Sequence, residues 1–115
     1  MIDAITKLYT KLSTYGTFYY MLAETKTFPY GTFQLNIPST TFKTGIVELV
    51  VDLWDNDISR VETTRQSVWR GLDGFIANNA TMALSVRQLS NFAVPDPNVA
   101  IHRRQLTFQV LLEGA

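Results

Sequence analysis

The sequence predicts an α+β fold in which two helices pack on one face of an antiparallel sheet of about four strands. Hydrophobic residues recur with the period of an amphipathic helix in two segments, and they alternate with polar residues, as in strands, in four others. The elements follow one another as helix, two strands, helix, two strands. Consecutive strands favour antiparallel pairing, with the helices on the apolar face of the sheet.

The chain has 115 residues, which is the length of one domain, and residues 1–115 are predicted to fold as a single unit. The absence of cysteine excludes disulfides and thiolate metal sites and suits a reducing compartment. The apolar runs are too short to span a membrane, so we expect no membrane contact. The first residues lack the apolar core of a signal peptide, and we expect the chain to begin here in a cytoplasm.

Ten basic and ten acidic side chains cancel, so the composition does not support the affinity for phosphates that nucleic-acid binding requires. The charges are unevenly distributed along the chain. Residues 1–57 hold four lysines against six acids, and residues 58–115 hold six arginines against four acids. Two interpretations stay open: one mixed surface, or two faces of opposite sign that would suit head-to-tail association.

The first helix is predicted at the N-terminus. Apolar residues recur at spacings of three and four from Ile2 to Leu12, which predicts an amphipathic helix over residues 2–13 that Gly16 ends. Residues 17–30 are rich in aromatic side chains but show no period. We expect an irregular connection there, with room for one short strand.

Two strands are predicted in the first half of the chain. From Gly31 apolar and polar residues alternate until Pro38 stops the run. A second alternating run covers residues 45–54. Its apolar face is formed by Val47, Leu49, Val51 and Leu53.

Two more strands are predicted in the second half. The first includes Met82 and Val86, and the second presents Leu106, Phe108, Val110 and Leu112 on one side. Between them the segment SNFAVPDPN, residues 90–98, contains two prolines and predicts a stiff loop. The side chains predicted to form the centre of the core are Val51, Leu53, Val68, Leu72, Phe108 and Val110.

Three acids, Asp52, Asp55 and Asp57, stand within six positions at the end of the second strand. The motif SRVE at residues 59–62 has the pattern of a capping box, so its serine is predicted to be the N-cap of the second helix. In a regular strand Asp52 and Asp55 point to opposite faces, so a metal site would need them to converge from different directions. We therefore interpret Asp55 and Asp57 as turn and capping groups, and we expect no bound metal.

No cluster of residues has the pattern of a catalytic or cofactor site. His102 is the only histidine, no G-x-S-x-G elbow is present, and neither G-x-G-x-x-G nor a Walker pattern occurs. Paired carboxylates of the glycosidase type stay open, but nothing selects such a pair. We interpret His102 as a residue near the start of a strand, and we expect no catalytic activity and no cofactor.

The second face of the predicted sheet is polar across all four strands. It is formed by Thr32, Gln34, Asn36, Glu48, Asp52, Ser85, Arg87, Gln105, Thr107 and Gln109. A solvated sheet face and a contact or lining surface between subunits are both compatible with this pattern. Phe42 and Phe92, each in a predicted polar loop, are either anchors for a partner or side chains folded back over their own core.

Several segments together are typical of one family. These are the amphipathic first helix, the Phe28-Pro29-Tyr30 element before a strand, the strand VELVVDLWDND, the helix that opens with S-x-x-E, and the closing strand RRQLTFQVLLE. In this order they resemble the tail-completion, or tail-terminator, proteins of long-tailed bacteriophages. The resemblance covers nearly the whole chain and rests on the order and size of the elements.

The resemblance implies a structural virion protein of the tail and neck, assembled in the host cytoplasm. It implies a ring, of six copies, at the head-proximal end of the tail tube, where it ends tube growth and docks the head connector or stopper protein. DNA would pass through the lumen without sequence-specific binding. The alternatives are a neck or head-completion (stopper) protein on the connector side, a non-viral binding module and, third, a small enzyme.

A closed ring needs two different surface patches that complement each other. The uneven distribution of charge predicts what these patches contain. We expect an acidic patch that includes Glu48, Asp52 or Asp55, a basic patch that includes Arg87, Arg103 or Arg104, and apolar anchors at Phe42 or Phe92.

Overall fold

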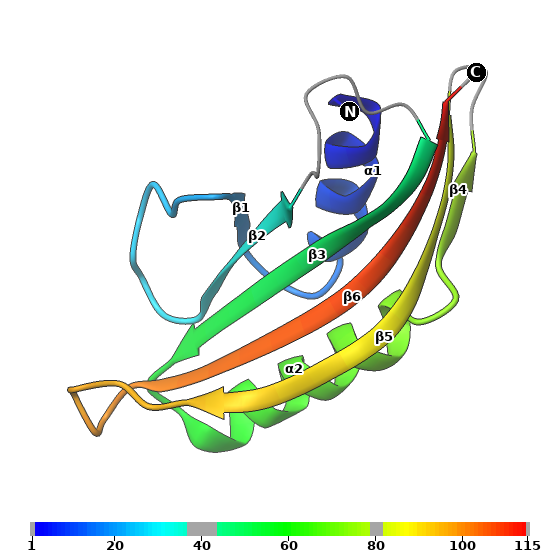
Figure 1. Ribbon diagram of the computed structural model, residues 1–115. Coiled ribbons are helices and arrows are strands. Elements are labelled where there is room, and N and C mark those ends of the chain that lie inside the picture. Colours follow the sequence, from blue (N-terminus) through cyan, green and yellow to red (C-terminus); the bar gives the residue numbers. More distant parts are fainter. Residues whose placement is uncertain (1, 37–43, 79–81, 115) are drawn as a thin grey trace.

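The computed structural model describes residues 2–36, 44–78 and 82–114 and shows a curled six-stranded sheet with both helices on one face (Figure 1). The elements in chain order are α1 (Ile2–Leu12), β1 (Phe18–Tyr20), β2 (Tyr30–Asn36), β3 (Thr44–Asp55), α2 (Ile58–Leu72), β4 (Ile76–Asn78), β5 (Met82–Val94) and β6 (His102–Gly114). The predicted fold class is confirmed, whereas the predicted number of strands is wrong.

The strands lie side by side in the order β1-β2-β3-β6-β5-β4. Neighbouring strands are antiparallel except β1, which runs parallel to β2. The four strands predicted from the sequence are the four central ones. Of the two outer strands, β1 lies in the segment where room for one short strand was expected, and β4 was not predicted. Each is three residues long, which is too short for an alternating pattern to be recognised.

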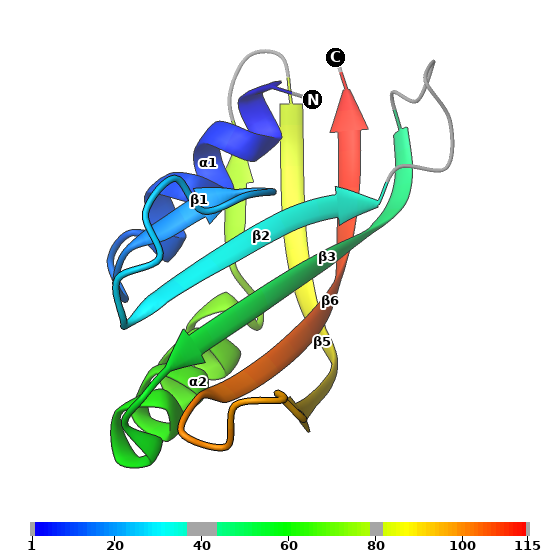
Figure 2. The ribbon, with the colours of Figure 1, turned by 90° about the vertical axis from the view of Figure 1, so that its left-hand side faces the viewer.

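Both helices lie on the same side of the sheet, α1 toward one end of the strands and α2 toward the other (Figure 2). Their apolar stripes and one face of the sheet form a single hydrophobic core. Leu8 and Leu12 come from α1, and the ring of Trp69 on α2 lies 5.4 Å from the ring of Phe108. All six side chains predicted for the centre of the core are buried, which confirms the assignment of the sheet faces.

The segment predicted as a stiff loop, residues 90–98, differs from its prediction because its first part belongs to β5. β5 continues through Val94 and pairs with β6 up to Arg103, so Phe92 lies on a strand and not in a loop. The register shifts between Gln88 and Ser90. This β-bulge interrupts the alternation of apolar and polar side chains, which is why the sequence pattern ends before the strand does.

The start of α2 also differs from its prediction. The N-cap is Asp57, whose side chain accepts a hydrogen bond from the amide of Arg60 at 3.1 Å. Ser59 is already inside the helix, and the predicted capping box at residues 59–62 is not formed. Aspartate and serine cap equally well, and the aspartate comes first along the chain.

Candidate interaction surface

The face of the sheet opposite the helices, called here the open face, is built from the side chains that alternate with the core. The strand register places all ten predicted polar residues on it. Paired residues form rows across the strands, such as Thr32, Asp52, Gln105 and Phe92. The predicted polar face is therefore present, but it is polar only in its middle.

One end of the open face is aromatic. Tyr30 stacks between Phe28 and Trp54, with ring centroids 5.7 and 5.1 Å apart, and the guanidinium of Arg103 lies 4.9 Å from the centroid of the Trp54 ring. Burial raises the pKa of the Tyr30 phenol, and the nearby Asp96 carboxylate raises it further, although Arg103 opposes the shift. Stacked rings and an arginine above an indole form a rigid surface of the kind common in protein interfaces.

The other end of the open face is aliphatic. Ile46 and Leu111 are directly paired on β3 and β6, and Ile76 follows on β4 beyond Ser85. All three aliphatic side chains are exposed. None of the three was predicted as a contact residue, because Ile46 and Leu111 stand at positions where the alternation predicts polar residues and Ile76 lies in a strand that was not predicted.

Asp52 lies in the row next to the aromatic end. Its Oδ1 accepts hydrogen bonds from Nη2 of Arg103 and Nε2 of Gln105, both at 3.1 Å. The acid and the base that were predicted to meet across a subunit boundary therefore meet within one chain. They lie on β3 and β6, which are neighbours in the sheet.

Asp55 points to the opposite face, as the alternation predicts, and its residue is only 1% exposed. Arg60 donates two hydrogen bonds to its carboxylate, at 2.8 and 2.6 Å, and the amide of Asp57 donates a third at 3.1 Å. Burial by itself would raise the pKa of Asp55, but these hydrogen bonds outweigh it and the pKa is lowered. The interpretation of Asp55 and Asp57 as turn and capping groups is confirmed.

Arg104 also points to the helix face. Its Nε donates to Glu62 at 2.6 Å, and Glu62 accepts a second hydrogen bond from Arg65 at 2.8 Å. Burial would raise the pKa of Glu62, but the two arginines lower it. Arg65 reaches on to the side-chain oxygen of Asn91 at 3.2 Å, so this network ties α2 to β5 and β6.

The eight residues predicted as contacts thus have different positions. Phe42 lies outside the described residues. Asp55 and Arg104 form ion pairs with residues of α2 on the helix face of the sheet, and Asp52 and Arg103 pair with each other. Glu48, Arg87 and Phe92 are exposed on the open face.

The acidic and basic halves of the sequence do not form two separate faces here. Because β3 and β6 pair in the sheet, Asp52 of the first half and Arg103 of the second lie side by side on the open face. Of the two interpretations of the charge distribution, the mixed surface describes these residues.

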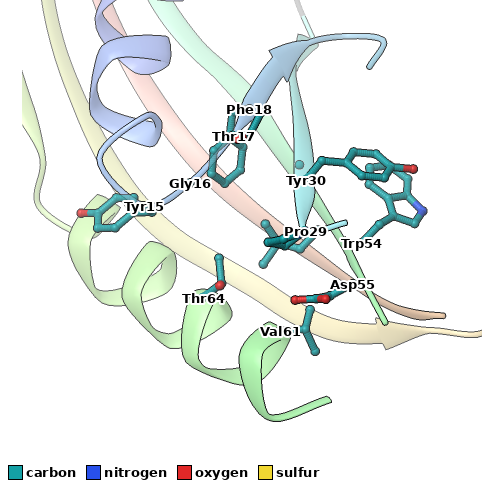
Figure 3. A pocket seen from close by; sticks show the side chains of 12 residues that line it. Tyr15, Gly16, Thr17, Phe18, Pro29, Tyr30, Trp54, Asp55, Val61 and Thr64 are labelled. Atoms are coloured by element: carbon teal, nitrogen blue, oxygen red, sulfur yellow. The ribbon is translucent and has the colours of Figure 1, made fainter. Parts of the chain in front are cut away.

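A cavity of about 30 Å³ lies between the start of β1, the turn at Pro29 and α2 (Figure 3). Val61 and Thr64 border it from α2, and the carboxyl group of Asp55 borders it from the end of β3. Its volume suits one or two water molecules and is far below that of a cofactor pocket.

His102 begins β6 opposite Asp55, as expected of a residue near the start of a strand.

Across residues 2–36, 44–78 and 82–114, no three histidine, aspartate or glutamate side chains gather as a metal site would require. Neither helix in the described part of the chain has the length and apolar character needed to cross a membrane.

The fold is similar to that of a known virion protein. No protein-family model matches the sequence, and no curated protein matches it. Among solved structures, a chain in the virion of a native gene transfer agent particle superposes with a TM-score of 0.68 and 14% sequence identity, covering 90% of this chain and 84% of that chain. At this identity the comparison establishes a shared fold along most of both chains.

Proposed function

We propose that this protein is a structural subunit of a virion, and that it acts as a tail terminator. In this role it forms a ring, most simply of six copies, at the head-proximal end of the tail tube, ends tube growth and joins the tail to the head connector. The observation that carries the proposal is the fold shared with a virion chain over 90% of the length of this protein. The resemblance of its sequence to tail-completion proteins supports the same assignment.

The surface of the chain is compatible with such a role. Its open face ends in an aromatic cluster on one side and in exposed aliphatic side chains on the other, and surfaces of this kind are used for contacts between subunits. The proposal assigns no catalytic activity and no cofactor to the protein. DNA would pass through the ring without sequence-specific binding, in a virion assembled in the host cytoplasm.

Tube growth in the presence of the purified protein tests the proposal. Tail tube protein is polymerised with and without it, and tube lengths and tube ends are measured by electron microscopy. We expect shorter tubes that carry a ring at one end, and co-sedimentation of the protein with the tubes. Binding to the connector but not to the tube would favour the stopper role, and unchanged tube lengths with a strictly monomeric protein would refute the terminator role.

A further inference from the structure

A turn beyond β1, at one edge of the sheet, exposes neighbouring apolar side chains. Met21 is 61% exposed and Leu22 is 75% exposed, and Tyr20 before them is also exposed. We call these three residues the projecting turn. Exposed aliphatic side chains next to one another at a sheet edge are typical of a contact surface.

The projecting turn is held in place. The amide of Met21 donates to the carbonyl of Phe33 at 2.8 Å, the amide of Leu22 donates to the carbonyl of Tyr20 at 2.8 Å, and the ring of Tyr20 packs edge-on against Phe33. Met21 has a φ of 67°, which is uncommon for a residue with a side chain and is often found where function fixes the backbone. The turn therefore presents Met21 and Leu22 from a fixed base.

The opposite edge of the sheet contains an apolar hollow. It has a volume of about 160 Å³ and lies across β4, β5 and β6. Its apolar lining is formed by Ile76, Ala83, Leu84 and Leu111, and its polar lining by Asn78, Ser85 and Glu113. Ile76 is 64% exposed. The hollow is open to solvent, and its volume is large enough for one leucine or methionine side chain that enters from outside.

The projecting turn and the edge hollow are on opposite sides of the molecule. β1 and β4 are the two outer strands of the sheet, and Figure 1 shows the turn after β1 on the left and β4 on the right. A projection and a hollow on different surfaces make a heterologous contact, which produces a ring when the rotation between copies closes.

The charges around the two surfaces can pair with each other, because each surface is bordered by one acid and one base. Glu24 and Lys26 follow the projecting turn, Glu113 lines the edge hollow, and Arg87 is the next residue after Ser85 on the same face of β5. All four are exposed, and none of them forms an ion pair with another described residue. Each surface thus offers one acid and one base to the other.

We propose that the projecting turn of one copy inserts Leu22, with Met21 beside it, into the edge hollow of the next copy. Lys26 then faces Glu113, and Glu24 faces Arg87. This inference rests on the proposed function, because it names the contact from which the ring would be built. The apolar insertion supplies most of the affinity, and the charges set the orientation of the copies.

Sedimentation over a range of protein concentrations, with and without tail tube protein, tests the insertion. Leu22→Glu and Ile76→Glu should each raise the concentration needed for ring formation roughly tenfold or more. Val99→Glu is the matched control, because Val99 is 91% exposed and lies in the connection between β5 and β6. It should assemble like the wild-type protein, and equal melting temperatures should show that all three variants fold.

A charge exchange tests the orientation. Lys26→Glu should weaken assembly, and combining it with Glu113→Lys should restore part of the loss. Loss of assembly in the single variant without any recovery in the double variant would contradict the pairing of these two residues.

Disulfide cross-linking tests the contact directly, because the chain contains no cysteine. A variant with both Leu22→Cys and Ile76→Cys should give a ladder of linked copies under mild oxidation, ending at the closed ring. A variant with Val99→Cys and Ile76→Cys should give no ladder. Rings that form without the ladder and tolerate Leu22→Glu would overturn this contact and leave the proposed function intact, whereas a protein that never assembles would overturn both.

Discussion

Asp57 is the N-cap of α2, and its side chain accepts a hydrogen bond from one of the free amides of the first helical turn. The amide it binds is that of Arg60, whose side chain in turn holds the buried carboxylate of Asp55. Arg60 therefore donates hydrogen bonds to both acids, through its amide to Asp57 and through its side chain to Asp55. Glu62 takes no part in capping and instead accepts hydrogen bonds from Arg65 and Arg104.

The assignment of the cap can be tested by two substitutions. Asp57→Ala should lower the free energy of unfolding by about 1 kcal/mol, because an orphan amide of the helix loses its partner. Ser59→Ala should change it by less than about 0.5 kcal/mol, because Ser59 lies within the helix. Urea unfolding followed by circular dichroism measures both values, and a larger loss for Ser59→Ala would show that the serine is the cap.

At the scale of elements, α2 packs against the segment after α1 through a close contact between Gly71 and the ring of Tyr15. A Cβ atom added to Gly71 would overlap the hydroxyl group and ring of Tyr15. The ammonium of Lys11 lies 5.6 Å from the centroid of the Tyr15 ring and 5.5 Å from that of Phe75. The glycine therefore leaves room for the Tyr15 ring, although it weakens the helix that contains it.

This contact predicts that the effect of one substitution depends on another. Gly71→Ala should destabilise the wild-type protein, because Tyr15 must move, despite a gain in helix propensity of at most about 1 kcal/mol. In a Tyr15→Ala background the same change should be stabilising. A double-mutant cycle from urea unfolding should give a coupling energy of about 1 kcal/mol or more, and additive effects would show that Tyr15 does not pack against Gly71.

At the scale of the whole molecule, arginines from α2 and β6 hold two partly or fully buried carboxylates. Asp55 and Glu62 both have lowered pKa values in the folded protein. A carboxyl group whose pKa is lower when folded stabilises the protein above its unfolded pKa, which is about 4 for these residue types. The stabilisation is lost as the pH falls through the folded pKa values.

The protein should therefore melt at a progressively lower temperature below about pH 4. Asp55→Asn and Glu62→Gln should each lower the melting temperature at pH 7, and the difference from the wild-type protein should shrink toward pH 3. Glu48→Gln is the control, because Glu48 is exposed and forms no ion pair with another described residue. Melting curves between pH 7 and pH 2.5 that remain parallel in all variants would contradict the role of these two carboxylates.

The sequence by itself determined the fold class, the four long strands, both helices and the side of each strand that is buried. Residues such as Leu49 and Phe108 are buried because the period of the apolar residues, a local property, gives each element one apolar face that folding must cover. It also determined that the acids at the end of β3 mark a boundary, because Asp52 and Asp55 point to opposite faces of the strand.

Only the tertiary structure decided which side chains meet across elements. The pairing of β3 with β6 brings Asp52 of the acidic half beside Arg103 of the basic half, across more than fifty residues of sequence. The short edge strands and the bulge in β5 depend on neighbouring strands for their hydrogen bonds, so no local pattern announces them. The exposure of Leu22 and Ile76 likewise depends on the tertiary structure, because the order of the strands decides which residues lie at the two edges of the sheet.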